Sequence, residues 1–275
     1  MVRVKLVVGV LVCVLVAVLA SAGLGWLWYG HNSGWEARSY PIKDVSRVDA
    51  AGGCIMTITQ GDRDALLIQG KPESLARIRV DQTGDLLTLR LSSYTRDISW
   101  RNFANLHNDS YRYVLQLKNL QHLTLDDACI ATIGDWHGDS LEVNARQASK
   151  VDFENLTLQH FAIEQRQASH SRFKTLSAAT AKFQVANASY VNVHEPSEVG
   201  SIALRVGHAS HFDGKLLRAQ QAQVEADHAS DVEISVTREL DVTASYASNV
   251  DYWGAPDAKV KEIQASNVNA HAANN

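Results

Sequence analysis

Hydrophobic and polar residues alternate along most of the chain beyond residue 30, and in the C-terminal half the alternating segments repeat. Alternation with a period of two is typical of β-strands that bury one face. An Ala-Ser pair marks each repeat, with Ala128-Cys129 in the equivalent position of an earlier one. The pair occurs at Ala148-Ser149, Ala168-Ser169, Ala188-Ser189, Ala209-Ser210, Ala229-Ser230, Ala247-Ser248 and Ala265-Ser266. From Cys129 onward its second residue recurs at intervals of 20, 20, 20, 21, 20, 18 and 18 residues.

A fixed period of this size predicts a solenoid in which each repeat stacks on its neighbour. We therefore expect an all-β fold, a right-handed parallel β-helix with about 20 residues per coil, because parallel crossovers are right-handed as a rule. Each coil is expected to hold a strand, a tight turn at Ala-Ser, a second strand and a third short strand. The third strand is represented by Leu156 and Leu158 in one coil, and by Leu216 and Leu217 in another.

The serine of the repeat shares its parity with an apolar column two residues later, which contains Val151, Val191 and Val232. The pattern places the serine on the inward face, where a small hydroxyl can bond a nearby backbone group. Polar residues flank the pair and are predicted to stack outside the coil. They are Gln147, Gln167, Asn187, His208, His228, Tyr246 and Gln264 before the alanine, and Lys150, His170, Tyr190, His211, Asp231, Asn249 and Asn267 after the serine.

The segment before residue 123 alternates too, but it lacks the 20-residue repeat. Residues 78–91 predict a β-hairpin around Thr83-Gly84-Asp85, and residues 74–77 allow one helical turn at most. The pattern divides the chain into four parts. Residues 1–29 form a membrane anchor or signal peptide, and residues 30–39 a linker. Residues 40–270 form one β-helix domain, and residues 271–275 a tail. Within the domain, residues 40–122 are an atypical β-rich cap with early strands, and 123–270 are regular coils.

The N-terminus carries Arg3 and Lys5 ahead of an apolar run, residues 6–29, which we expect to form a hydrophobic helix. The small residues Ala20-Ser21-Ala22 fit the cleavage site of a signal peptide. The run continues to Trp26-Leu27-Trp28-Tyr29, however, and is long enough to cross a bilayer with an aromatic belt at its end. We favour the uncleaved anchor. Either interpretation places residues 30–275 outside the cytoplasm.

Composition narrows the classes of function. The chain of 275 residues is 45% hydrophobic and 20% charged, with a formal net charge of −4. It therefore has no electrostatic reason to bind nucleic acid. Of the three cysteines, Cys54 and Cys129 lie beyond the apolar run, without metal-ligand spacing. They can pair in an oxidising compartment, but the pattern favours two small buried residues that are not bonded to each other.

One group of side chains has the chemistry of a metal site. The spacing predicts that His208 stacks on His228, and His211 on Asp231, one coil apart. Imidazoles and a carboxylate are ligands for zinc or copper. The alternative is an exposed polar ladder, which we favour. Carboxylates are scattered over many coils and no catalytic motif occurs, so we expect no enzyme, no catalytic residue and no cofactor.

The sequence resembles the head GIN domain family, described as auto-transporter adhesins of the bacterial envelope. The resemblance covers about residues 40–270 and includes the recurring Ala-Ser-x-Val. Its motifs are Asp44-Val45, Ile58-Thr59-Gln60-Gly61-Asp62, Gly84-Asp85-Leu86-Leu87-Thr88-Leu89, Ala247-Ser248-Asn249-Val250-Asp251-Tyr252-Trp253-Gly254-Ala255-Pro256 and Ile263-Gln264-Ala265-Ser266-Asn267-Val268. It implies a right-handed β-helix in the cell envelope and brings no agreed catalytic residues. The family often has Gly-Ser-Gly where this chain has Ala-Ser-x.

Together these features favour a noncatalytic cell-envelope protein that binds a protein or glycan along its flank, held at the membrane by residues 6–29. The alternatives are a structural scaffold without a ligand and a carbohydrate-active β-helix enzyme. Residues 30–275 would then lie on the periplasmic side of the inner membrane if residues 6–29 remain as an anchor, or be exported if a signal peptide is cleaved.

Replacing Val191 with aspartate tests the inward assignment of its column. The change places an unpaired charge in the middle of the stack and disturbs both neighbouring coils, so we expect a loss of at least about 3 kcal/mol in the free energy of unfolding. Thermal unfolding measures it, and a variant as stable as the parent would contradict the assignment.

Overall fold

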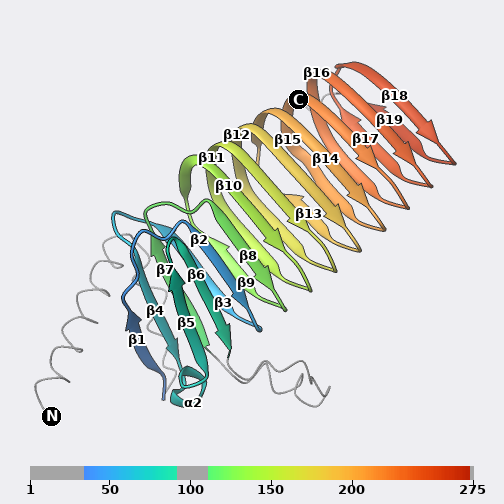
Figure 1. Cartoon of the computed structure of the whole chain (residues 1–275). Coiled ribbons are helices and arrows are strands. Elements are labelled where there is room, and N and C mark those ends of the chain that lie inside the picture. Colours follow the sequence, from blue (N-terminus) through green and yellow to red (C-terminus); the bar gives the residue numbers. More distant parts are fainter. Residues whose placement is uncertain (1–33, 92–110, 273–275) are drawn as a thin grey trace, which may run out of the picture.

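The computed structural model describes residues 34–91 and 111–272, which form an elongated parallel β-solenoid of about 8 turns (Figure 1). All of the described strands belong to one continuous 19-stranded sheet. The predicted all-β solenoid of about 20 residues per coil is confirmed. The expected hydrophobic helix within residues 1–29 lies outside the described residues. In the part of the chain that is described, no helix is long and apolar enough to cross a membrane.

The regular coils begin at residue 122, next to the position that the repeat predicts. Their strands are β8 (His122–Asp126), β9 (Ile130–Ile133), β10 (Trp136–Ala145), β11 (Lys150–Gln165), β12 (His170–Ala186), β13 (Tyr190–Val193), β14 (Ser197–Gly207), β15 (His211–Ala226), β16 (Asp231–Ser245), β17 (Asn249–Trp253), β18 (Asp257–Ile263) and β19 (Asn267–His271).

Each coil has three faces, and the longest strands bend around their edges. In β11 the inward residues Val151, Leu156 and Ile163 lie on three successive faces, and each pairs in register with a residue of β12, 20 positions later. The third short strand is thereby confirmed. Leu216 and Leu217 also lie in a strand, β15, as expected; Leu217 is fully buried and Leu216 is 43% exposed, because adjacent strand residues point to opposite faces.

The N-terminal end is a cap in which coils are stacked out of sequence order. Its elements are β1 (Glu36–Tyr40), β2 (Arg47–Ala51), β3 (Ile55–Gln60), β4 (Ala65–Gly70), α2 (Pro72–Leu75), β5 (Ile78–Thr83), β6 (Leu86–Leu91) and β7 (Tyr111–Leu117). The coil of β2 and β3 pairs with β8 and β9 on one side and with β6 and β7, which follow it in sequence, on the other.

Antiparallel strands close this end of the stack. The predicted hairpin is confirmed, since β5 pairs antiparallel with β6 and Val80 faces Leu89 across it. On the neighbouring face, β4 pairs antiparallel with β7, and β1 with β4. The parallel edge of the solenoid is therefore covered at its N-terminal end, which limits edge-to-edge association there.

The Ala-Ser corner is a turn with left-handed backbone at two successive residues. In one coil Gln167 and Ala168 have φ of 61° and 60°, and the same two positions are left-handed at every corner from Asp127-Ala128 to Gln264-Ala265. The alanine N–H donates to a carbonyl of the next coil, as from Ala168 to Asn187 at 2.9 Å. Hydrogen bonds between coils therefore continue through the corners as well as along the faces.

The serines are buried inside the corners, as predicted, and several of them form a hydrogen-bonded ladder from coil to coil. The hydroxyl of Ser189 donates to the carbonyl of Ala186 at 2.8 Å and accepts the N–H of Ser169 at 3.3 Å. The Ser230, Ser248 and Ser266 hydroxyls likewise donate to the carbonyl three residues earlier, at 2.6–2.9 Å. These bonds give partners to buried backbone groups at the sharpest point of the coil.

Cys54 and Cys129 form a disulfide bond, with their Cα atoms 4.5 Å apart. Their burial is confirmed, but the prediction that they are not bonded to each other is wrong. Both occupy the serine position of stacked corners. The earlier corner is Gly52-Gly53-Cys54, where the glycines have φ of 97° and 69° in place of the usual x-Ala. Without an Ala-Ser signature, and 75 residues away, it gave no sequence signal of its stacking.

Phenylalanine rings fill the middle coils. Phe153 stacks on Phe173 with ring centroids 4.4 Å apart, and Phe183 meets Phe212 edge to face at 5.0 Å. Phe161 contacts both Phe173 and Phe183, at 5.4 and 5.6 Å. All five side chains are buried, so the interior of these coils is packed with protein atoms.

Ser189→Ala tests the serine ladder. The change removes one partner from the carbonyl of Ala186 and one from the N–H of Ser169, so we expect unfolding free energy to fall by about 1–2 kcal/mol. Ser201→Ala, on the half-buried outer side of β14, is the control and should change stability much less. Urea unfolding measures both, and equal losses would contradict the role of the ladder.

Candidate functional site

The outward residues beside each corner are held in two stacked columns. In the column before the alanine, His208 stacks on His228 with centroids 4.8 Å apart and planes 6° apart, and Tyr246 stacks on His228 at 4.6 Å. In the column after the serine, Tyr190 lies between His170 at 4.8 Å and His211 at 5.0 Å. The fixed turn gives equivalent side chains the same direction in successive coils, which is why the rings stack.

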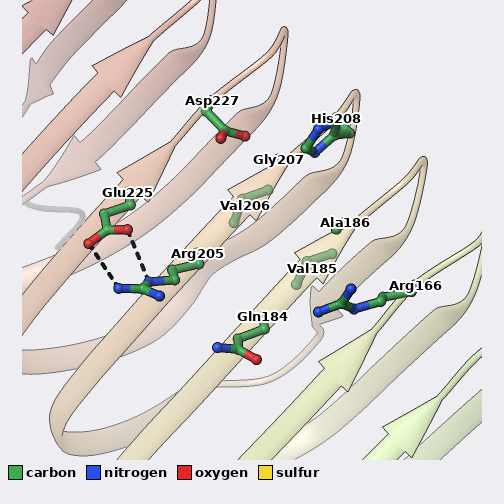
Figure 2. Close-up of a pocket in the computed structure, with 10 residues that line it drawn as sticks. All are labelled: Arg166, Gln184, Val185, Ala186, Arg205, Val206, Gly207, His208, Glu225 and Asp227. Carbon is green, nitrogen blue, oxygen red and sulfur yellow. Dashed lines mark hydrogen bonds and ion pairs between the residues drawn. The ribbon is translucent and has the colours of Figure 1, made fainter.

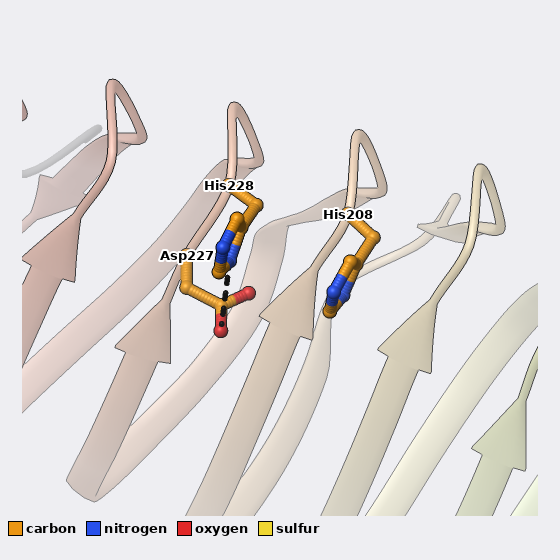
Figure 3. A group of neighbouring side chains, drawn as sticks. All are labelled: His208, Asp227 and His228. Atoms are coloured by element: carbon orange, nitrogen blue, oxygen red, sulfur yellow. Dashed lines mark ion pairs between the residues drawn. The ribbon is translucent and has the colours of Figure 1, made fainter.

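The structure confirms both predicted pairs but not one common site. His208 stacks on His228, and His211 is in register with Asp231. The two pairs belong to different columns, on opposite sides of the turn. A different carboxylate joins the first pair: one ligand atom each of His208, Asp227 and His228 lies within 4.8 Å of the others (Figure 3). We call these three residues the His-Asp-His triad.

Gly207 explains how the carboxylate of Asp227 comes close to the two histidines. The two residues occupy the same position in successive coils, three before the serine. A Cβ atom at Gly207 would lie only 2.1 Å from Oδ1 of Asp227, so the missing side chain leaves the space that this carboxylate uses. The backbone of Gly207 is not left-handed, so glycine is needed here for the close approach of the Asp227 carboxylate and not for the backbone conformation. The spacing of the histidines gave no signal for this contact.

A groove on the same flank includes two members of the triad, His208 and Asp227, in its wall (Figure 2). Its volume is about 360 Å³. The position three before the serine changes from Arg166 to Ala186 and then to Gly207, so the row of side chains is interrupted at these coils. The groove is lined by Arg166, Gln184, Val185, Ala186, Arg205, Val206, Gly207, His208, Glu225 and Asp227.

The charges of the groove are largely paired. Nε of Arg205 lies 3.0 Å from a carboxylate oxygen of Glu225, and Arg166 forms an ion pair with Glu164. His228 lies 3.4 Å from Asp227. The groove therefore presents hydrogen-bond donors and acceptors side by side, and its surface is not dominated by charge of one sign.

Several of the scattered surface carboxylates bind side chains of the next coil. Asp152 accepts hydrogen bonds from Arg172 at 2.7 and 3.0 Å, and Glu154 lies 3.6 Å from Lys174. Asp135 accepts a bond from Asn155 at 2.6 Å. These contacts run along the stack and stabilise its register.

Two pKa shifts belong to one ion-pair network on the first face of β11 and β12. Partial burial tends to raise the pKa of Asp152, but hydrogen bonds from Arg172 and Lys150 and their charges outweigh it, so its pKa lies below the ordinary value. Burial, together with the charges of Arg172 and Lys150, lowers the pKa of His170. The network therefore favours ionised Asp152 and neutral His170.

Fold and surface together define an elongated β-solenoid with stacked polar columns and an open groove on its flank. The chain belongs to the head GIN domain family: residues 44–256 match the family model described as "Putative auto-transporter adhesin, head GIN domain". The resemblance in the sequence is thereby confirmed. None of the curated proteins matches the chain.

Crystal structures of bacterial proteins share the fold. One is a "putative lipid binding protein" from Parabacteroides distasonis, with a TM-score of 0.77 and 14% identity over 87% of this chain and 98% of that one. Another is a "putative adhesin" from Parabacteroides merdae, with a TM-score of 0.75 and 12% identity over 87% and 97%. A third, from Bacteroides fragilis, has a TM-score of 0.62 and 14% identity over 88% and 98%. At these identities the likeness concerns the fold alone.

Asp152→Asn should lower stability by about 0.5–1 kcal/mol near neutral pH, because it removes the charge that Arg172 and Lys150 stabilise. The folded pKa of Asp152 is lowered, so its contribution is present above the unfolded pKa of about 3.9 and disappears as pH falls through the folded value. The difference between variant and parent should therefore shrink in acid. Urea unfolding at neutral and acidic pH measures it, with exposed Asp241→Asn as control; a gap independent of pH would contradict the ion-pair role.

Proposed function

We propose that this protein is a noncatalytic cell-envelope module that binds a hydroxyl-rich glycan in the groove on its flank. The groove is the observation that carries the proposal. It crosses several coils from Arg166 to Asp227 and is lined by guanidinium, amide, imidazole and carboxylate groups. Such a mixture of donors and acceptors suits sugar hydroxyls, and an open shape suits a chain of sugars better than a compact apolar molecule.

The adhesin-like family supports a binding role without catalysis. The paired carboxylates support it too, because Glu225 is engaged by Arg205 and Asp152 by Arg172 instead of converging on one point. A structural scaffold without a ligand is the runner-up, and a carbohydrate-active enzyme is the third candidate. A lipid ligand, suggested by the description of one relative, has less support, because the middle coils are filled by phenylalanine rings.

We infer that the domain of residues 40–270 lies outside the cytoplasm, on the periplasmic side of the inner membrane, held by residues 6–29 as an uncleaved anchor. The disulfide between Cys54 and Cys129 supports this location, because such bonds persist in oxidising compartments. The envelope assignment of the family supports it as well.

A glycan array probed with the purified chain tests the binding role. Ala186→Arg should abolish binding of the glycans that the parent retains, because it restores the arginine found at Arg146 and Arg166 and fills the groove. Gln220→Arg adds the same charge at an exposed position outside the groove and should bind as the parent does. Absence of any bound glycan would favour the scaffold, and turnover of a bound glycan would favour the enzyme.

A further inference from the structure

We propose that the His-Asp-His triad binds a divalent transition-metal ion, with zinc as the reference ion. The proposal stands on the geometry of His208, Asp227 and His228 and does not depend on the glycan. The three candidate ligand atoms lie within 4.8 Å of one another. Two imidazole nitrogens and one carboxylate oxygen form a ligand set that suits zinc, with further positions left for water.

The histidines are close enough to share one ion if their rings rotate out of the parallel stack, because an imidazole nitrogen binds a metal in the plane of its ring. Zinc–nitrogen bonds of about 2.1 Å in tetrahedral geometry bring two ligand nitrogens to roughly 3.4 Å from each other. The stacked rings of His208 and His228 have centroids 4.8 Å apart. Both side chains are exposed at the surface, so closing the remaining gap requires rotation about side-chain bonds and no movement of the backbone.

The two rings differ in their freedom to move. His228 lies between His208 and Tyr246, whose ring covers its other face at 4.6 Å with planes 15° apart. The position preceding His208 in the column holds Asn187, which has no ring. His228 is therefore the held ligand, and His208 is the one that tilts toward the ion.

Asp227 supplies the negative charge that two neutral imidazoles lack. Its Oδ2 lies 3.4 Å from Nδ1 of His228, on the side where Figure 3 shows the ring nitrogens of both histidines. Arg205 of the groove wall is paired with Glu225 at 3.0 Å, which reduces its repulsion of a cation. His211 and Asp231 offer the same chemical groups in the other column, with no third ligand grouped with them among the described residues, which makes them a matched comparison.

Isothermal titration of the metal-free full chain with zinc chloride tests the proposal. We expect a site with one ion per chain, in the micromolar range, and no comparable heat from calcium, which prefers oxygen ligands. His208→Gln, His228→Gln and Asp227→Asn should each weaken zinc binding by at least about tenfold. The double variant His211→Gln/Asp231→Asn should bind zinc as the parent does.

Gly207→Ala provides a test that removes no ligand. Its Cβ would occupy the space beside Oδ1 of Asp227 and displace the carboxylate, so we expect zinc affinity to fall while the melting temperature of the apo chain confirms folding. The proposal is overturned if the parent gives no zinc heat at micromolar concentrations. It is also overturned if the His211/Asp231 variant loses as much affinity as the triad variants do.

Discussion

Two successive residues adopt left-handed backbone at each Ala-Ser corner, and the solenoid is built on that turn. Side chains disfavour this conformation by roughly 1–2 kcal/mol per residue, so a corner such as Gln167-Ala168 needs compensation. The alanine N–H bonds to the next coil, and the serine hydroxyl bonds the carbonyl that precedes the turn. The serine of such a corner therefore has a structural role.

Because the corner is the same in each coil, the surface is determined by which side chain occupies each equivalent position. The position three before the serine shows this most clearly. Arginine at residue 166 projects from the flank, alanine and glycine at 186 and 207 leave a gap, and Asp227 extends into the space beside Gly207. The groove and the triad both arise from this one interruption of the column. Binding features in such a fold are local departures from the repeat.

The repeat was sufficient to predict the coils, the inward serines and the stacking of His208 on His228, since parity and period fix side-chain direction and register. It could not predict the order of coils at the N-terminal end, where β6 and β7 stack outside β2 and β3. That order is set by tertiary pairing of segments that do not repeat. The disulfide was missed for the same reason, and Asp227 because its contact depends on a side chain that Gly207 lacks.

The stacking of the columns also limits how they recognise a ligand. In the stack of His208, His228 and Tyr246 the rings cover one another's faces, so the faces between neighbours are closed to a sugar ring. Apart from the outer faces of His208 and Tyr246 at the two ends of this stack, the rings present their edges to solvent, with their nitrogen atoms and hydroxyl group. Edges bind through hydrogen bonds or by coordinating a metal ion, not by stacking. The turn that aligns the side chains thus suits these columns to polar and metal chemistry, and the glycan contacts that we propose lie in the groove.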